Sequence, residues 1–403
     1  MRIAFITYEF PPDTGKGGIG TYTKQVSDIL AKEKWDVHVF AGSHTRQEKN
    51  VEEGLTVHRI KCTSPHDFKL NVLQVFSDIQ TVQAFDILES PEINGNAGEI
   101  KIKYPQIPLV VRLHAPGYLV ESLKKTYVPF LAKLRYVLGS LRTLRFDLGY
   151  WRAYNKLNDA DYHFTRMADY ITAPSEAMKD WVIKNWQLPA NKIVVLPNIF
   201  EPAQEMLDVP IFRECKHKRI LFFGRLNVLK GLVNATRAMK KILKAYPDWT
   251  FRVIGDDGPG PNFKMTMRAW MTWQLEYVIK QVEFMDGLPY EDLPAAVADC
   301  EIVLLPSLFE SFSYTCAEAM AAGKAVVGSN NAGMADLLQN GKSGVLINPY
   351  GYKEIVRALK ELIENNSYRY ELSSGARKRI TTAFDAEKTA LKFNMFYEKI
   401  VDK

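Results

Sequence analysis

The sequence predicts an α/β protein with two domains, each built on a parallel β-sheet. The chain has 403 residues, which exceeds one ordinary hydrophobic core and indicates two domains of about 150–200 residues each. Short apolar runs alternate with amphipathic helical runs along most of the chain, as in consecutive βαβ units. Apolar residues make up 47% and charged residues 24% of the sequence, which is typical of a globular protein.

Composition excludes several other classes of protein. The net charge of +6 is mild for this length and does not indicate a nucleic-acid-binding protein. The four cysteines are dispersed, without Cys-x-x-Cys pairs, which favours a reducing compartment. The N-terminal run MRIAFITYEF lacks a signal-peptide cleavage region and fits a first strand. No run approaches the roughly 18 apolar residues of a membrane span, so we expect a cytoplasmic protein.

The first domain is predicted to cover residues 1–197. A glycine-rich loop at 9–20 separates the first strand from an amphipathic helix at 21–33. Residues 198–215 contain two prolines and no clear periodicity, and we expect them to link the domains. The apolar runs predicted as strands are residues 3–8, 37–41, 57–59, 84–88, 109–113, 170–173 and 193–196.

The second domain is predicted to cover residues 216–384 and repeats the same alternation. Its expected strands are residues 219–223, 250–254, 282–285, 302–305 and 325–328. Its expected helices are residues 232–245, 290–300, 314–322, 353–365 and 367–376. A final amphipathic helix is expected at 385–401.

Four motifs follow strands of these two domains, and their combination is specific although each alone is weak. They are the glycine-rich loop after the first strand, Gly224-Arg225 with Lys230-Gly231, Glu310 with Glu318, and Gly333 with Gly341. Together they resemble the retaining glycosyltransferases of the GT-B fold, in the glycogen-synthase-like superfamily and its large bacterial family four. The resemblance implies two Rossmann-like domains facing each other across a cleft. It also implies that the C-terminal helix, about 385–403, packs on the first domain.

The resemblance also implies the reaction. A hexose-type sugar would pass from a nucleoside-diphosphate sugar, with UDP favoured, to a hydroxyl of a saccharide or lipid-linked saccharide, with retention of anomeric configuration. The second domain would bind the donor and the first the acceptor, in polysaccharide or glycolipid biosynthesis. No cofactor or metal is expected. Two alternatives are a nucleotide-sugar epimerase of the same architecture and a non-catalytic nucleotide-sugar-binding protein.

The spacing of Glu310 and Glu318 fits a nucleotide sugar. Glu310 lies in the loop after strand 302–305, and Glu318 lies on the following helix, a position where open α/β sheets bind ligands. Eight helical residues span about 12 Å, roughly the reach from a sugar ring across a diphosphate to a ribose. We therefore predict that Glu310 holds sugar hydroxyls and Glu318 ribose hydroxyls. The alternative is an exposed pair of surface glutamates.

Backbone amides and two cations complete the predicted donor site. Unpaired N–H groups near the start of the helix favour electron-rich oxygens. These amides belong to Ser311, Phe312 and Ser313. Arg225 and Lys230 follow strand 219–223, and two fixed cations suit a diphosphate whose charge grows as the glycosidic bond breaks. The alternative is an ordinary surface Arg and Lys.

The first domain supplies the remaining candidates, all by resemblance. His114 is expected beside the reacting sugar, whereas a lone histidine at a strand end is often structural. Gly17 and Gly18 are expected to let the backbone approach the donor phosphates. Their loop matches G-x-G-x-x-G, but it does not follow the strand directly and no acid ends the second strand, so a dinucleotide site is disfavoured. Asn198 is expected to shape a turn.

Two acidic pairs and one departure from the family pattern need interpretation. Asp159 and Asp161 form a D-x-D string, which we interpret as solvated charge because no apolar strand precedes it. Asp256 and Asp257 fit a loop and helix start better than a metal site. The family commonly has a second glycine and a glutamate where this chain has Ala332 and Asp336, which bears on donor details around the nucleotide or helix start.

The segment 119–156 interrupts the alternation of strands and helices. It is mixed with aromatic residues and leucines and carries only two acids. Its basic residues are Lys124, Lys125, Lys133, Arg135, Arg142, Arg145, Arg152 and Lys156. It fits a solvated helical pair or, alternatively, a surface that contacts anionic lipid on the inner face of a membrane.

Overall fold

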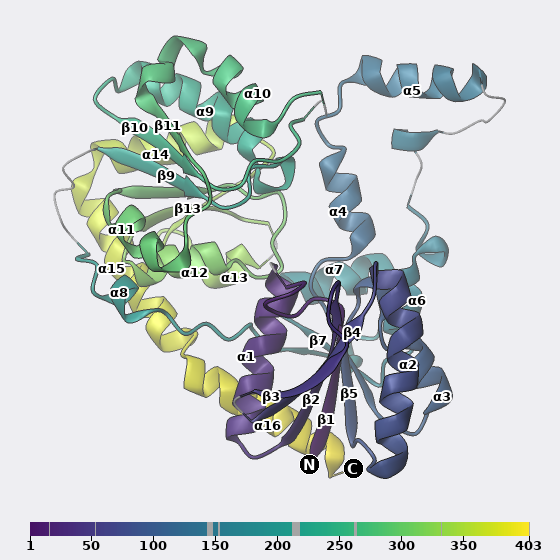
Figure 1. The fold of residues 1–403 in the computed structure, drawn as a ribbon. Helices are drawn as coiled ribbons and strands as arrows, with labels where there is room; N and C mark the ends of the chain where they lie inside the picture. Colours follow the sequence, from purple (N-terminus) through teal and green to yellow (C-terminus); the bar gives the residue numbers. More distant parts are fainter. Residues whose placement is uncertain are drawn as a thin grey trace. The chain divides into compact units, whose positions relative to one another are not determined.

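The structure is a computed structural model, and the chain divides into two compact α/β units (Figure 1). It describes residues 1–15, 17–52, 54–142, 148–151, 154–211, 218–261, 264–331 and 333–402. Unit 1 comprises Met1–Gly117, Asn155–Ile199 and Phe384–Lys403, and unit 2 comprises Tyr118–Tyr154 and Phe200–Ala383. Each unit contains one largely parallel sheet, which confirms the predicted fold class.

Unit 1 has an eight-stranded sheet in the order β3-β4-β2-β1-β5-β6-β7-β8. Its strands are β1 (Arg2–Thr7), β2 (Asp36–Ser43), β3 (Glu48–Glu52), β4 (Leu55–Lys61), β5 (Ile87–Pro91), β6 (Leu109–Arg112), β7 (Tyr170–Ala173) and β8 (Ile193–Val195). Only β3 is antiparallel to its neighbour. The strand order reverses between β1 and β5, and ligands of open α/β sheets bind beyond the carboxyl ends of the strands at such a reversal.

Helices cover this sheet on both faces. The α-helices of unit 1 are α1 (Gly18–Lys32), α2 (Pro65–Val82), α3 (Gly98–Lys103), α6 (Ala160–Arg166), α7 (Glu176–Trp186) and α16 (Ala386–Val401). The short 3-10 helices are η1 (Ile93–Gly95), η3 (Lys156–Asn158) and η4 (Ala190–Lys192).

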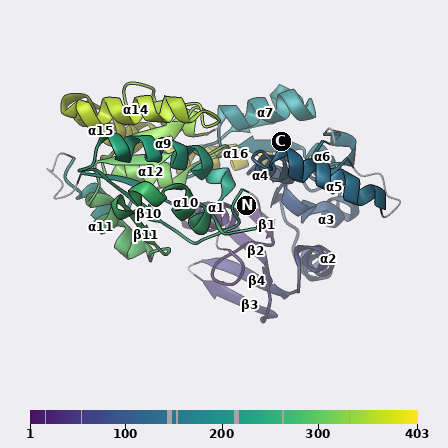
Figure 2. The ribbon, with the colours of Figure 1, turned by 90° about the horizontal axis from the view of Figure 1, so that it is seen from above.

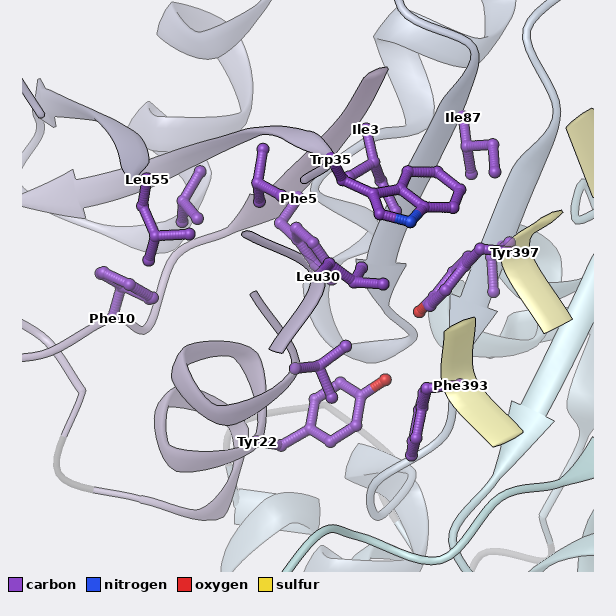
Figure 3. Packing of buried hydrophobic residues seen from close by; sticks show 14 of the residues in the cluster. Ile3, Phe5, Phe10, Tyr22, Leu30, Trp35, Leu55, Ile87, Phe393 and Tyr397 are labelled. Atoms are coloured by element: carbon purple, nitrogen blue, oxygen red, sulfur yellow. The ribbon is translucent and has the colours of Figure 1, made fainter. Parts of the chain in front are cut away.

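The C-terminal helix α16 belongs to the core of unit 1. It packs beside α1, and the rings of Phe393 and Tyr397 point into the same apolar cluster as Tyr22 and Trp35 (Figure 3). The indole N–H of Trp35 donates a 2.8 Å hydrogen bond to Asn394. Burial of one apolar stripe of α16 therefore ties the end of the chain to unit 1.

Unit 2 has a six-stranded parallel sheet in the order β11-β10-β9-β12-β13-β14. Its strands are β9 (Arg219–Phe223), β10 (Thr250–Ile254), β11 (Val282–Met285), β12 (Ile302–Leu305), β13 (Ala325–Ser329) and β14 (Val345–Ile347). From β9 the sheet continues through β10 to β11 at one edge, and from β12 it continues through β13 to β14 at the other edge. The strand order therefore reverses between β9 and β12, the strands before the two predicted donor-binding loops.

Two pairs of helices pack together in unit 2, α9 with α14 and α12 with α15 (Figure 1, Figure 2). The α-helices are α4 (Gly117–Lys124), α5 (Phe130–Arg142), α8 (Gln204–Leu207), α9 (Leu232–Ala245), α10 (Met267–Gln274), α11 (Leu293–Ala298), α12 (Tyr314–Ala321), α13 (Met334–Leu337), α14 (Tyr352–Glu364) and α15 (Asn366–Ala383). The 3-10 helices are η2 (Gly149–Trp151), η5 (Val228–Lys230), η6 (Glu276–Gln281) and η7 (Tyr290–Asp292).

Two segments differ from the sequence-based domain bounds. Residues 118–154 were assigned to the first domain, but their contacts group them with unit 2. Asn234 on α9, for example, donates a 2.8 Å hydrogen bond to the hydroxyl of Tyr127. The expected linker contains α8, whose Met206 is fully buried, while residues 212–215 lie outside the described part of the chain. Among the described residues, no helix is long and apolar enough to cross a membrane.

Candidate active site

The loops after β9 and β12 pack directly on each other in unit 2. Their strands are neighbours, with Ile220 opposite Ile302. Gly231 adopts a left-handed φ of 71°, and a Cβ there would lie 1.7 Å from the carbonyl oxygen of Pro306. The amide of Leu308 donates a 2.7 Å hydrogen bond to the carbonyl of Leu229. Only glycine fits this approach, which brings the Lys230 loop against the Glu310 loop.

The Lys230 ammonium and the Glu310 carboxylate form an ion pair at this junction. The short helix η5 ends at Lys230, and its cap residue Asn227 accepts a 3.2 Å hydrogen bond from the Lys230 amide. Lys230 Nζ contacts Glu310 Oε1, which also accepts a 3.0 Å hydrogen bond from Ser307 Oγ. The side chains are only 19% and 15% exposed. Among the described residues Glu310 Oε2 has no partner, so one oxygen is anchored and the other can accept a ligand hydroxyl.

Arg225 follows β9 directly and is exposed. It comes after Gly224, whose φ of 136° favours glycine. The next residue, Leu226, is fixed by a 2.8 Å bond from its amide to the carbonyl of Asp256. In the described part of the chain no ion pair holds the Arg225 guanidinium, and its role as a diphosphate ligand stays a prediction.

Glu318 lies one turn into α12 and is partly buried. Burial raises its pKa to about 8, because no cation pairs with it among the residues that the structure describes. Ser313 caps the helix by accepting a 3.3 Å hydrogen bond from the Cys316 amide. Phe312 and Ser313 are buried, whereas Ser311 is partly exposed. The predicted acids and amides therefore lie along one loop-to-helix segment, as the spacing indicated.

His114 in unit 1 follows β6 and is 7% exposed. Its amide donates hydrogen bonds of 2.8 and 2.9 Å to the two carboxylate oxygens of Glu92. Its ring meets the ring of Tyr22 edge-on, with centroids 5.3 Å apart. Burial and, to a lesser degree, the Arg112 charge lower the pKa of His114 to about 3, so its imidazole is neutral at physiological pH and suits hydrogen bonding rather than charge.

Gly17 and Gly18 lie at the start of α1 in unit 1. A Cβ at Gly18 would meet no atom within 4 Å, and one at Gly17 would lie 3.1 Å from Glu9 Oε2. Gly18 is exposed, and packing within unit 1 does not require glycine there. The role predicted for these two residues at the donor phosphates stays a prediction.

Comparisons with known proteins agree with this geometry. Residues 16–204 match the model of Glycosyltransferase Family 4, and residues 209–379 match that of Glycosyl transferases group 1. The chain belongs to the GT-B glycosyltransferases. This confirms the resemblance to the glycogen-synthase-like superfamily, and the protein is a transferase.

The similarity to the two relatives and two solved structures named here covers nearly all of this chain and of theirs. The chain is 23% identical to a glycogen synthase of Mycobacterium tuberculosis, covering 97% of this chain and 92% of the relative. It is 29% identical to a D-inositol 3-phosphate glycosyltransferase of Corynebacterium diphtheriae, covering 93% and 90%. The solved sucrose-phosphate synthase of Thermosynechococcus elongatus has a similar fold, with a TM-score of 0.73, 17% identity and coverage of 99% and 98%. Anabaena Alr3699/HepE, solved in complex with UDP, gives a TM-score of 0.68 at 18% identity, covering 99% and 100%.

Sequence reasoning singled out Gly333 without predicting that it supports the Glu310 loop, and it missed the supporting role of Asn331. The amide of Gly333 donates a 2.7 Å hydrogen bond to the Glu310 carbonyl, and a Cβ there would lie 2.0 Å from the Ser311 carbonyl oxygen. Asn331 Nδ2 bonds the carbonyl of Leu308. The motif around Gly333 therefore supports the loop and begins α13. The departure at Ala332 lies outside the described residues, and Asp336 lies on α13, where its carbonyl accepts a bond from Arg379.

The solvated-charge interpretation of Asp159 and Asp161 is wrong. Each residue is only 9% exposed. Asp159 caps α6, and Asp161 accepts bonds from the amides of Gly117 and Asn94. For Asp161 the polar sequence concealed this role because its partners are main-chain groups of distant loops. Asn198 likewise accepts a 2.5 Å bond from the Arg112 guanidinium, beyond the local turn role expected for it.

Asp257, the second residue of the other acidic pair, has the helix-start role that the sequence predicts. Asp257 Oδ1 accepts 3.0 Å bonds from the amides of Gly258 and Arg268, and Arg268 lies in the first turn of α10. Within the described ranges, no group of three or more His, Cys, Asp or Glu residues could hold a metal ion.

Proposed function

We propose that this glycosyltransferase moves a hexose-type sugar from a nucleoside-diphosphate sugar to a hydroxyl acceptor, with retention and without a metal. The observation that carries the proposal is the Lys230–Glu310 ion pair at the strand-order reversal of unit 2. It joins an anion-binding cation and a sugar-binding carboxylate at the place where open α/β sheets bind ligands. Unit 1 is proposed to bind the acceptor, a saccharide or lipid-linked saccharide in polysaccharide or glycolipid biosynthesis.

The diphosphate is assigned to Arg225 and Lys230. Both follow β9, and Lys230 keeps its ammonium beside Glu310 at 19% exposure. As the bond to the sugar breaks, negative charge grows on the leaving diphosphate, and fixed cations stabilise it most in the transition state. UDP is the favoured nucleotide, and it is supported by Anabaena Alr3699/HepE, a structural relative solved with UDP and with UDP-glucose.

The two glutamates are assigned to the two ends of the donor. Glu310 would accept sugar hydroxyls through its unpartnered Oε2, and the N–H groups of Ser311, Phe312 and Ser313 lie beside it. Glu318 would accept ribose hydroxyls, and binding of a diol favours its ionised form. His114 would hydrogen-bond the sugar near its 6-hydroxyl, and Gly17 and Gly18 would face the donor phosphates; these three assignments rest on the resemblance.

Retention is proposed to occur without a covalent sugar–enzyme intermediate. Glu310 is the carboxylate assigned to the sugar, and the Lys230 ammonium balances its charge, which lowers the nucleophilicity of both carboxylate oxygens. The bond between the sugar carbon and the phosphate oxygen would break as the acceptor oxygen bonds the same face of that carbon. The acceptor proton would pass to the departing phosphate oxygen, so charge and atoms balance.

A thermal-shift panel followed by product analysis tests the proposal. UDP, GDP and ADP are added to the full chain, and the nucleotide that stabilises it most identifies the base, with UDP expected. The matching hexose donor is then incubated with simple saccharides, and NMR of the product should show the donor's anomeric configuration. An inverted product, or no stabilisation by any nucleoside diphosphate, contradicts the proposal.

Two other activities are distinguished by the same experiment. An epimerase would release an isomeric nucleotide sugar without any acceptor, and a non-catalytic binding protein would be stabilised by the nucleotide yet transfer nothing. Acceptor-dependent release of the nucleoside diphosphate is the result expected for the transferase.

We also propose that segment 119–156 contacts an anionic membrane surface, on its inner face. The observation is helix α5 in unit 2, which buries none of its side chains; Phe130, Leu131 and Leu138 are 67%, 65% and 52% exposed. Phe130, Leu134, Val137, Leu138 and Leu141 recur at three- and four-residue intervals and form one apolar stripe. The basic residues Lys133, Arg135 and Arg142 flank this stripe, as in helices that lie in a lipid interface.

Vesicle sedimentation tests this contact. The full chain should sediment with vesicles containing phosphatidylglycerol at low salt, and less with purely zwitterionic vesicles. Replacing Phe130 and Leu138 by Ser should reduce binding, while the same replacement at exposed Leu391 on α16 serves as the control. Equal sedimentation of the wild type, the Phe130 and Leu138 variant and the Leu391 variant contradicts the proposal. Arg145 and Arg152 of the segment lie outside the described residues.

A further inference from the structure

We propose that Glu92, assisted by Asp161, is a positioning residue that fixes the segment 114–117 and thereby the orientation of the His114 imidazole. Neither acid was singled out as a ligand-binding or catalytic group, and both act within unit 1. The inference rests on the role of His114 in the proposed function. It states which buried groups hold that histidine in place before any ligand binds.

Glu92 binds the main chain at the start of this segment. It is fully buried and follows β5 directly. Both of its carboxylate oxygens accept the amide hydrogen of His114, at 2.8 and 2.9 Å. The amide of Glu92 itself donates to the carbonyl of Arg112 at 3.2 Å. The pairing of β5 with β6 thus continues past the strand ends through the side chain of Glu92.

Asp161 binds the other end of the segment. It lies in the first turn of α6 and is 9% exposed. One oxygen accepts a 2.9 Å hydrogen bond from the amide of Gly117, and the other accepts a 3.3 Å bond from the amide of Asn94. Asn94 has a left-handed φ of 67°, in the turn that follows Glu92. The two acids therefore join the loops after β5 and β6 at both ends of the His114 segment.

Burying the carboxylates of Glu92 and Asp161 costs free energy, so their presence inside unit 1 needs a structural reason. Neither forms an ion pair with a cation in the described part of the chain, and both are bound by main-chain amides. Burial raises the pKa of Glu92 to about 8 and also raises the pKa of Asp161. Buried polar groups without a charged partner are retained where their hydrogen bonds fix a required geometry. Here the geometry that they fix is the backbone of His114 and its neighbours.

The imidazole itself is in contact with the ring of Tyr22. The two rings meet edge-on at a centroid distance of 5.3 Å, and the Tyr22 hydroxyl donates a 2.9 Å hydrogen bond to the buried Glu89. The hydrogen bonds from the His114 amide to Glu92 fix the main chain of His114. The contact with the Tyr22 ring limits rotation of the imidazole. Loss of the Glu92 contact should therefore move the imidazole without unfolding unit 1.

The experiment is a double-mutant cycle on the full chain with Glu92→Gln, His114→Ala and both together. The probe reaction is hydrolysis of UDP-glucose, with GDP-mannose and ADP-glucose assayed alongside and the fastest donor used. Glu92→Gln should lower kcat by about 10–100-fold with donor KM little changed, as for a small misplacement of a reacting group. In the His114→Ala background the same change should have almost no further effect. Asp161→Asn is the second variant and should act in the same direction.

Ser175→Ala is the control for lost stability, because Ser175 lies in the same unit and its hydroxyl caps α7 by accepting a hydrogen bond from the Met178 amide. It should lower Tm without lowering kcat. Hydrogen exchange of the peptide covering 114–117 should be faster in Glu92→Gln than in Ser175→Ala, whichever donor is used.

The outcomes separate this inference from the proposed function. If His114→Ala leaves kcat unchanged, the proposed role of His114 fails, and the exchange measurement alone decides whether Glu92 holds the segment. If His114→Ala lowers kcat but Glu92→Gln lowers it equally in both backgrounds, Glu92 does not act through His114 and the inference is overturned. Unchanged exchange at 114–117 in Glu92→Gln overturns it as well.

Discussion

Glu318 shows at the residue scale how a group proposed to bind the ligand can lower stability. Burial raises its pKa to about 8, so between its ordinary value and 8 the folded chain keeps a proton that the unfolded chain releases. The free energy of unfolding therefore falls as pH rises through this window. The proposed ribose hydroxyls would bind the ionised form and so offset this cost when the donor is bound.

We predict that Glu318→Gln stabilises the protein in alkali while weakening nucleotide binding. A neutral amide removes the cost of a buried charge, so the Tm advantage over the wild type should grow from pH 5 to pH 9. Glu371→Gln, at an exposed glutamate on α15 of the same unit, should show no such trend. A Tm difference that is the same at both pH values would contradict the assignment, as would unchanged nucleotide affinity.

At this scale the sequence predicted where the charged residues lie, but not the groups that support them. The combined motifs after strands singled out Lys230, Glu310 and Glu318, and the roles of these residues stay predictions. The sequence did not indicate Ser307 or Glu92, because their roles arise from hydrogen bonds to loops that only the fold brings close. Asp161 was misread for the same reason, since a polar neighbourhood in sequence is not an exposed one in space.

At the element scale, the junction of the β9 and β12 loops depends on Gly231. Its left-handed φ of 71° and the 1.7 Å approach of a Cβ to the Pro306 carbonyl oxygen leave no room for a side chain. The residue is the cap at which η5 ends and α9 begins, so a shift there moves Lys230.

We predict that Gly231→Ala destabilises unit 2 by at least about 1–3 kcal/mol, as expected for strained backbone, and weakens nucleoside-diphosphate binding. Gly351→Ala is the matched control, because a Cβ at this helix cap would meet no atom within 4 Å and φ is ordinary. Urea denaturation and nucleotide titration measure both effects. Equal stability and affinity for the two variants would show that the loop junction tolerates a side chain.

Apolar periodicity located most strands but missed β3 and β14, and the three apolar residues of β14, VLI, form a run too short to stand out. β3 reads EKNVE and was not predicted because an edge strand needs no apolar run. The helical pattern at 290–300 proved to be η7 followed by α11, with Pro294 in the first turn. Helices α2 and α10 were not assigned, although Ser64 and Thr266 cap them in the manner typical of helix starts.

At the scale of the whole molecule, the C-terminal helix completes unit 1. Periodicity predicted a helix at 385–401 but gives no information about its partner, and only the resemblance indicated the first domain. The structure places the Phe393 and Tyr397 rings among residues of the β1 and α1 core (Figure 3). The Tyr397 hydroxyl also donates to Glu89, so α16 shares the buried network beside His114.

We predict that Phe393→Ala lowers the free energy of unfolding by about 3–5 kcal/mol, because it leaves a cavity in this core. Met395→Ala, at a side chain that is 58% exposed on the same helix, should cost little. Denaturation monitored by circular dichroism measures both variants. A similar small cost for the two would mean that α16 does not contribute to the core of unit 1.

The central claim is that Arg225 and Lys230 hold the diphosphate of a nucleotide donor in unit 2. Calorimetric titration tests it most directly, using the tightest of UDP, GDP and ADP and the corresponding free nucleoside. Arg225→Ala and Lys230→Ala should each weaken the diphosphate by roughly 10–100-fold, the value of a hydrogen bond to a charged group, and leave nucleoside affinity unchanged. Lys218→Ala, at an exposed lysine before β9, should change neither affinity. Normal diphosphate affinity in both site variants, or equal loss for the nucleoside, would contradict the account.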